Sequence, residues 1–189
     1  MKRIVFFASG SGSNVENIAT YFKGRNDIEI SAVLTNRKDA HVLERCERLQ
    51  LNALYFNRQS FYHSDLVLKT LKAINPHLIV LAGFLWKVPE AIIEEFPNRI
   101  INIHPALLPK YGGKGMYGIH VHKAVKESGD AVSGITIHYV NAQYDEGAII
   151  RQVTIAVDGS DTPENIADKV HQLEYQHYPL VIEELLQTA

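Results

Sequence analysis

The chain has 189 residues, of which 46% are hydrophobic and 21% charged, and its formal net charge at pH 7 is −2. This length favours one large domain with a sizeable core, and the near-neutral charge gives no electrostatic basis for binding nucleic acid or an anionic membrane. The single cysteine, Cys46, excludes an internal disulfide, and the apolar run at residues 4–8 is too short for a signal peptide or a membrane span. We therefore expect a cytoplasmic protein.

Apolar runs suited to buried strands alternate with helical stretches over the first 104 residues. The predicted strands cover residues 2–8, 28–35, 53–56, 78–82 and 99–104. The predicted helices between them cover residues 15–23, 40–49, 64–74 and 90–96. This alternation predicts a doubly wound, mostly parallel α/β sheet with right-handed crossovers.

The pattern changes after Pro109. The remaining predicted elements are a glycine-rich loop, a helix, two strands and a final helix, over residues 111–118, 119–128, 132–140, 148–157 and 163–186. The two strands are joined by residues 141–147, which leave no room for a crossover helix, so we expect an antiparallel hairpin. Thr162 or Asp161 is expected to cap the final helix.

The last strand of the parallel part carries two polar side chains. Because side chains on a strand alternate between faces, Asn102 and His104 share one face while Ile101 and Ile103 share the other. Pro105 ends the strand, so the polar pair lies at the carboxyl end of a core strand, where open α/β sheets bind their ligands. The alternative is a strand end whose polar groups are satisfied by nearby backbone.

The loop at residues 9–14 follows the first strand and contains two glycines, which let the backbone approach a ligand closely. Ser13 and Asn14 lie at a helix N-terminus, where free N–H groups and the helix dipole favour an anion. Val15 occupies the third glycine position of a dinucleotide fingerprint, and no Gly-Lys-Ser/Thr follows for a Walker A loop. We interpret the loop as a site for a monophosphate rather than NAD; a plain turn with a serine cap is the alternative.

The hairpin loop carries Asp145-Glu146-Gly147, a sequence also typical of an ordinary turn. If the loop folds over the end of the central strand, however, Asp145 can orient His104 and raise its pKa.

An amide, an imidazole and a carboxylate around one point suit a reaction at a carbonyl group. Asn102 can donate to a developing oxyanion, His104 can donate or move a proton, and Asp145 can set the histidine. No serine or cysteine nucleophile with a matching base is apparent. No metal site is expected, because the histidine pairs on the predicted helices point to different sides, namely His120 with His122 and His171 with His177.

Four motifs occur together in one order, over residues 9–14, 81–84, 102–109 and 145–147. In this combination the chain resembles the phosphoribosylglycinamide formyltransferases, the folate-dependent transformylases of purine synthesis. The resemblance covers nearly the whole chain. It implies a single formyltransferase domain over residues 1–189, whose N-terminal half binds the acceptor phosphate and whose C-terminal half contributes the folate site.

The resemblance also implies the reaction. The amine of 5'-phosphoribosylglycinamide would attack the formyl carbon of 10-formyltetrahydrofolate, the co-substrate, without a metal. Asn102 and His104 would stabilise the tetrahedral oxyanion, and Asp145 would assist His104 and the proton transfer to the folate nitrogen.

Binding residues follow from the same resemblance. The acceptor phosphate and ribose would contact Gly12, Ser13, Asn14, Arg58 and Glu174. The folate would lie against Leu85, Trp86, Lys87, Val88 and Asn102, largely through backbone contacts. Trp86 stands where relatives often carry arginine, and either packs over the folate or, as we favour, caps the next helix. The glycine-rich loop at 112–118 is longer than in many relatives, which affects the lid geometry.

Three other functions would use part of this pattern. A formyltetrahydrofolate hydrolase shares the three polar residues but would carry an additional N-terminal regulatory domain. A methionyl-tRNA formyltransferase would carry a C-terminal RNA-binding domain and lack the phosphate loop. A non-catalytic nucleotide-binding module would keep the loop at 9–14 without needing the three polar residues. The expected partners are small-molecule substrates, with no nucleic acid or membrane, and the sequence leaves monomer and homodimer open.

Overall fold

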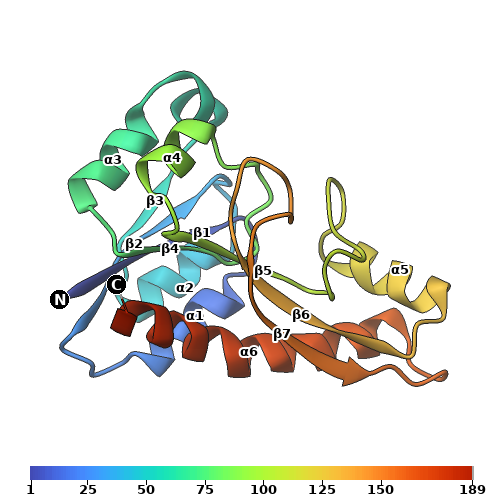
Figure 1. Ribbon diagram of the computed structural model, residues 1–189. Helices are drawn as coiled ribbons and strands as arrows, with labels where there is room; N and C mark the ends of the chain where they lie inside the picture. The colour runs from blue at the N-terminus through green and yellow to red at the C-terminus, as the bar shows by residue number, and fades with distance from the viewer. Residues whose placement is uncertain (189) are drawn as a thin grey trace.

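The computed structural model describes residues 1–188, which form one seven-stranded sheet covered by helices on both faces (Figure 1). The strand order is β3-β2-β1-β4-β5-β6-β7. The strands are β1 (Lys2–Ala8), β2 (Ile28–Thr35), β3 (Ala53–Tyr55), β4 (Leu78–Leu81), β5 (Ile100–His104), β6 (Val132–Tyr139) and β7 (Ile149–Ala156). Residue 189, the last of the expected domain, lies outside the described part.

The sheet is parallel from β3 to β5 and antiparallel from β5 to β7. This confirms the predicted mostly parallel sheet with an antiparallel C-terminal hairpin. The order also reverses direction after β1, since β2 lies on one side of β1 and β4 on the other. Such a reversal leaves a crevice at the carboxyl ends of the strands, which is where ligands bind in this architecture.

The helices divide between two hydrophobic cores. They are α1 (Ser13–Tyr21), α2 (Val42–Leu49), α3 (Leu66–Ile74), α4 (Glu90–Glu95), α5 (Ile119–Ser128) and α6 (Pro163–Thr188). Helices α1, α2, α5 and α6 contribute to one buried cluster, whereas α3 and α4 cover the opposite face (Figure 1). Along β5 the side chains alternate as predicted, with Ile101 and Ile103 in the first cluster and Ile100 in the second.

Several element boundaries differ from the predictions. A π-helical turn, η1 (Gln59–His63), precedes α3, which begins only at Leu66. Its Phe61 is buried in the α3/α4 core, so tertiary packing shapes this segment beyond the predicted helix. The predicted cap of α6 is confirmed for Thr162, whose hydroxyl accepts from the N–H of Asn165 while the Asn165 side chain accepts from the N–H of Thr162.

Helix α6 crosses the full length of the sheet and contains Pro179 (Figure 1). A proline leaves the carbonyl four residues earlier without its helical N–H partner. Here the carbonyl of Tyr175 instead accepts a hydrogen bond of 2.8 Å from Asn17 of α1. The two helices are thereby joined beside the loop that begins α1. No helix within residues 1–188 combines the length and apolar character needed to cross a bilayer.

Candidate active site

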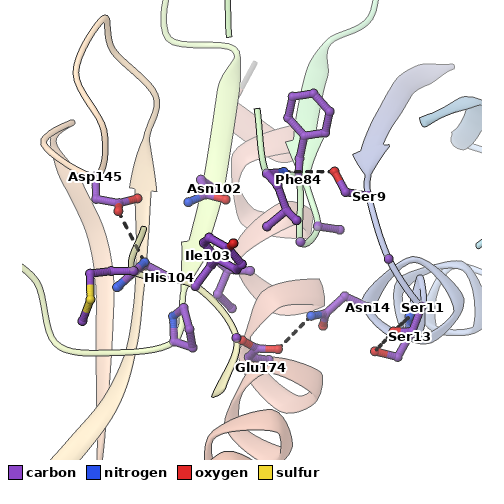
Figure 2. Close-up of a pocket in the computed structure, with 18 of the residues that line it drawn as sticks. Ser9, Ser11, Ser13, Asn14, Phe84, Asn102, Ile103, His104, Asp145 and Glu174 are labelled. Atoms are coloured by element: carbon purple, nitrogen blue, oxygen red, sulfur yellow. Dashed lines mark hydrogen bonds and ion pairs between the residues drawn. The ribbon is translucent and has the colours of Figure 1, made fainter. Parts of the chain in front are cut away.

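A cavity of about 650 Å³ opens at the carboxyl ends of β1, β4 and β5. The 9–14 loop borders it on one side, and Asn102, His104 and Asp145 border it on the other (Figure 2). Ser9 connects the loops that follow β1 and β4, because its N–H donates to the carbonyl of Gly83 and its hydroxyl accepts from the N–H of Leu85. The predicted anion loop and the predicted catalytic group thus share one cavity.

His104 is almost fully buried, with 3% of its surface exposed. Its Nε2 lies 2.7 Å from the carbonyl oxygen of Tyr111. A carbonyl only accepts, so Nε2 carries a proton and Nδ1 is the nitrogen that can gain or lose one. Nδ1 lies 3.6 Å from Oδ2 of Asp145, within ion-pair range but too long for a direct hydrogen bond (Figure 2).

The net pKa shift of His104 is opposite to the one predicted from Asp145 alone. Burial lowers the pKa of His104, and this effect exceeds the opposing contributions of the Asp145 carboxylate and the Tyr111 carbonyl, which raise it. The predicted influence of Asp145 is therefore present, but desolvation is larger. His104 is a neutral base near pH 7 before any substrate binds.

Asp145 occupies the cavity because three segments converge on it. Its backbone is left-handed at φ 56°, which turns the side chain inward, while the neighbouring Glu146 is exposed. Its Oδ2 accepts a hydrogen bond of 2.9 Å from the N–H of Gly113 in the glycine-rich loop. Of the two adjacent carboxylates, Asp145 is thus the one directed at His104, as predicted.

His138 is a site residue that the sequence reasoning missed. It faces Asn102 directly in the β5/β6 register, and the Asn102 Nδ2 and His138 Nε2 atoms are 3.2 Å apart. His138 Nε2 also lies 3.7 Å from Oδ1 of Asp145. A histidine within the predicted strand at residues 132–140 was the available signal, but its pairing depends on strand register, which the sequence alone does not specify.

The 9–14 loop is shaped by close packing against α2. Gly12 has a left-handed φ of 74°, and a Cβ atom built on it would lie 2.3 Å from Cγ2 of Val42. The Arg45 guanidinium donates to the carbonyl of Ser11 over 2.8 Å and pairs with Glu16 in the first turn of α1. These contacts hold the loop so that the N-terminus of α1 opens onto the cavity.

Asn14 and Glu174 form the floor beside this loop, with Asn14 Nδ2 donating to Glu174 Oε2 over 2.8 Å (Figure 2). Glu174 is 6% exposed, and burial raises its pKa more than the Asn14 hydrogen bond lowers it. Within residues 1–188, Asn14 Oδ1 and Nδ1 of the cavity-lining His122 are buried without a hydrogen-bond partner. Both atoms can be satisfied by a polar ligand in the cavity.

Four of the predicted binding residues do not line the cavity. The Arg58 guanidinium lies 4.9 Å from the centre of the Trp86 ring, within a cluster of aromatic side chains. Arg37, rather than Arg58, is the arginine that lines the cavity beside the 9–14 loop. Leu85 lines it too, whereas Val88 is buried in the α3/α4 core and the Lys87 carbonyl accepts from Tyr62.

The expectation that Trp86 caps a helix is wrong, because Pro89 is the residue that precedes α4. Trp86 instead packs on Phe56, Phe61 and Tyr62. For metals, no group of three or more histidine, cysteine or acidic side chains within residues 1–188 is arranged to hold an ion.

Residues 2–182 match a protein family described as formyl transferase. The chain is 36% identical to the phosphoribosylglycinamide formyltransferase of Bacillus subtilis, over 98% of this chain and 95% of the relative. It is 39% identical to the chloroplastic phosphoribosylglycinamide formyltransferase of Arabidopsis thaliana, over 96% of this chain but only 64% of that relative's length.

Among solved structures, glycinamide ribonucleotide transformylase 1 from Symbiobacterium toebii is similar with a TM-score of 0.89 and 33% identity, covering 100% of this chain and 89% of that one. The phosphoribosylglycinamide formyltransferase of Anaplasma phagocytophilum is similar with a TM-score of 0.89 and 29% identity, covering 98% and 87%. The sequence similarity and the structural similarity to these proteins both extend over the residues that line the cavity. The chain belongs to the formyl transferase family.

Proposed function

We propose that the protein transfers the formyl group of 10-formyltetrahydrofolate to the amine of 5'-phosphoribosylglycinamide, as one domain over residues 1–189. The observation that carries the proposal is that one cavity contains both the N-terminus of α1 and a group made of an amide, an imidazole and a carboxylate. An acceptor with a phosphate at one end and an amine at the other fits such a cavity. The names of the similar proteins support the same acceptor and the transfer of a formyl group.

At one end, Gly12, Ser13 and Asn14 would hold the acceptor phosphate. Backbone N–H groups in the first turn of a helix have no intrahelical partner, and the helix dipole adds a partial positive charge. Arg37, whose guanidinium is ion-paired with Asp39, adds a cationic side chain to the same wall. The ribose hydroxyls would pair with Glu174 and with the partnerless Oδ1 of Asn14.

At the other end, the acceptor amine would attack the formyl carbon, forming a C–N bond and placing a negative charge on the formyl oxygen. Asn102 donates an N–H to that oxyanion, a contribution that preorganised donors make efficiently in a desolvated site. His104 takes the proton released by the amine at Nδ1, and the resulting imidazolium is stabilised by Asp145. The proton then passes to the folate nitrogen as its bond to the formyl carbon breaks.

The folate would lie between the loop after β4 and the hairpin loop. Phe84, Leu85 and Tyr144 supply apolar wall to this part of the cavity, and Asn102 supplies a polar contact. The segment after Leu85, which contains Trp86, Lys87 and Val88, would pack behind this wall and hold it in place. The C-terminal half of the chain thus contributes Asn102, Tyr144 and Asp145, while Phe84 and Leu85 come from the N-terminal half.

The test is formyl transfer from 10-formyltetrahydrofolate to 5'-phosphoribosylglycinamide by the purified protein, followed by the appearance of tetrahydrofolate. Parallel reactions without acceptor and with methionyl-tRNA detect hydrolysis and tRNA formylation. Tetrahydrofolate is expected to form when the acceptor is present and not above the enzyme-free background when it is absent. Equal rates with and without acceptor would instead assign a hydrolase, and turnover on methionyl-tRNA alone would overturn the acceptor.

A further inference from the structure

The orientation of the Asn102 amide is set by a residue outside the predicted catalytic group. Asn102 on β5 and His138 on β6 are directly opposed, with Asn102 Nδ2 3.2 Å from His138 Nε2. His138 is 2% exposed, so the hydrogen-bond partners of its ring are protein groups and not bulk solvent. Which group donates in this pair therefore depends on the tautomer of His138.

The other ring nitrogen determines that tautomer. His138 Nδ1 lies 2.9 Å from the carbonyl oxygen of Tyr139, which can only accept, so Nδ1 carries the proton. Burial lowers the pKa of His138 despite the opposing effects of the Tyr139 carbonyl and Asp145, so the ring is neutral near pH 7. A neutral ring with a proton on Nδ1 has a lone pair on Nε2.

A lone pair on Nε2 accepts only one end of the Asn102 amide. The nitrogen end donates to it, whereas the oxygen end would bring two acceptors together. With Nδ2 held toward His138, one of its two N–H bonds is used in this contact and the other remains for the cavity that Asn102 lines. The His138 tautomer alone therefore requires the Asn102 amide to place Nδ2, and not Oδ1, toward the His138 ring.

The backbone acceptor is itself rigidly placed. The β6/β7 pairing is irregular between Ile137 and His138, the kind of bulge that redirects a side chain next to an active site. The N–H of Tyr139 donates to the carbonyl of Ala148 over 2.9 Å. Gly147 packs so closely that a Cβ atom on it would lie 1.6 Å from the Tyr139 oxygen, so no other side chain fits there.

We propose that His138 is a positioning residue. The fixed Tyr139 carbonyl sets the tautomer of His138, and the His138 ring in turn orients the Asn102 amide so that one Asn102 N–H points at the reacting carbonyl. The inference rests on the proposed function for its kinetic consequence, but the amide orientation itself does not. A competing role would act through Asp145, whose Oδ1 lies 3.7 Å from His138 Nε2. At that distance no direct hydrogen bond forms, which favours the route through Asn102.

Two substitutions separate the ring's chemistry from its volume. His138→Phe fills the space without an acceptor, and His138→Gln retains a carbonyl oxygen that can accept from Asn102. We expect His138→Phe to lower kcat on the order of 10- to 100-fold, less than deleting the Asn102 donor, with either KM changed by less than about 3-fold. The kcat of His138→Gln should be at least about tenfold higher than the kcat of His138→Phe.

Double-mutant cycles identify the residue through which His138 acts. In an Asn102→Ala background His138→Phe should lower kcat by no more than about 2-fold, while in an Asp145→Asn background its effect should persist. A full additional loss in the Asn102→Ala background overturns the proposal. Loss of the effect only in the Asp145→Asn background assigns the competing route and overturns it too.

A nitrogen-edited NMR spectrum provides a readout that needs no turnover. The Asn102 side-chain amide protons, identified by their absence in Asn102→Asp, should shift in His138→Phe and stay near their original positions in His138→Gln. Unchanged resonances in both variants refute the positioning role of His138. If the wild-type protein transfers no formyl group, the proposed function fails, while these spectra still decide the role of His138. Should His138→Phe not fold, His138→Leu replaces it.

Discussion

Gly12 offers the sharpest test of how the anion loop is built. Substituting alanine adds one methyl group at a left-handed φ of 74°, and its Cβ would lie 2.3, 2.6 and 2.9 Å from three atoms of Val42. The left-handed conformation costs about 1–2 kcal/mol for a residue with a Cβ. Overpacking adds typically about 1–3 kcal/mol, because Val42 is fully buried and two of the three atoms are Cα and Cβ, which cannot rotate away.

We therefore expect Gly12→Ala to lower the free energy of unfolding by about 2–5 kcal/mol. Two other glycines separate the contributions. Gly24 has φ 85° with nothing within 4 Å of an added Cβ, so Gly24→Ala isolates the backbone term of about 1–2 kcal/mol. Gly10 lies in the same loop, also with open space around it and no left-handed φ, so Gly10→Ala should stay within about 0.5 kcal/mol.

Urea unfolding of the three variants gives these free energies, and steady-state kinetics gives the functional effect. Because Gly12 shapes the loop and does not touch the folate side, Gly12→Ala should raise the acceptor KM much more than the folate KM. Gly24→Ala, which lies outside the cavity lining, should change neither KM by more than about 2-fold. If Gly12→Ala proved no more destabilising than Gly24→Ala, the close approach to Val42 would not govern the loop, and this account of it would be wrong.

Four further results are expected. Asn14→Leu should raise the acceptor KM far more than the folate KM, and equal rises in steady-state assays would contradict the loop assignment. Because His104 acts as the base, His104→Ala should lower kcat about 100- to 1,000-fold with the fold intact by circular dichroism, and near-normal turnover would contradict that role. Burial lowers the pKa of His104 and the Asp145 carboxylate opposes that shift, so Asp145→Asn should lower the pKa of His104 further and should also lower kcat. NMR titration measures the pKa and pH–rate profiles measure the effect on kcat. Glu146→Gln, which changes an exposed side chain, is the control. Burial raises the pKa of Glu174 in the folded state, so the contribution of Glu174 to stability falls as pH rises from its unfolded-state pKa through its folded-state pKa. Glu174→Gln should therefore stabilise the protein more at pH 8 than at pH 5 in urea unfolding, and it should raise the acceptor KM. A stability difference that does not change with pH would contradict the burial argument.

Much of this fold follows from local sequence patterns. Strand and helix periodicity located the elements to within a few residues, because burial of one face imposes a repeat of two or of about 3.6 on the chain itself. The shared face of Asn102 and His104 and the cap at Thr162 are of this kind, since each depends on residues a few positions apart. The short hairpin connection likewise determines the antiparallel pairing without any tertiary information.

Parts of the site depended instead on contacts between distant residues. Asp145 beside His104 was expected from the family resemblance, but its left-handed backbone and the Gly113 hydrogen bond come from two loops meeting. The Arg58 side chain lies on Trp86 because an aromatic cluster assembled from separate segments offers its cation a face.

The sign of the His104 pKa shift and the role of His138 were decided only by the tertiary structure. A neighbouring charge can be anticipated from sequence, but the desolvation that outweighs it is a sum over everything packed around the ring. The pairing of His138 with Asn102 requires one strand register, and a slip of a single residue would turn the histidine to the other face. Register is fixed by the whole sheet and by the irregularity at residues 137 and 138, which no local pattern encodes.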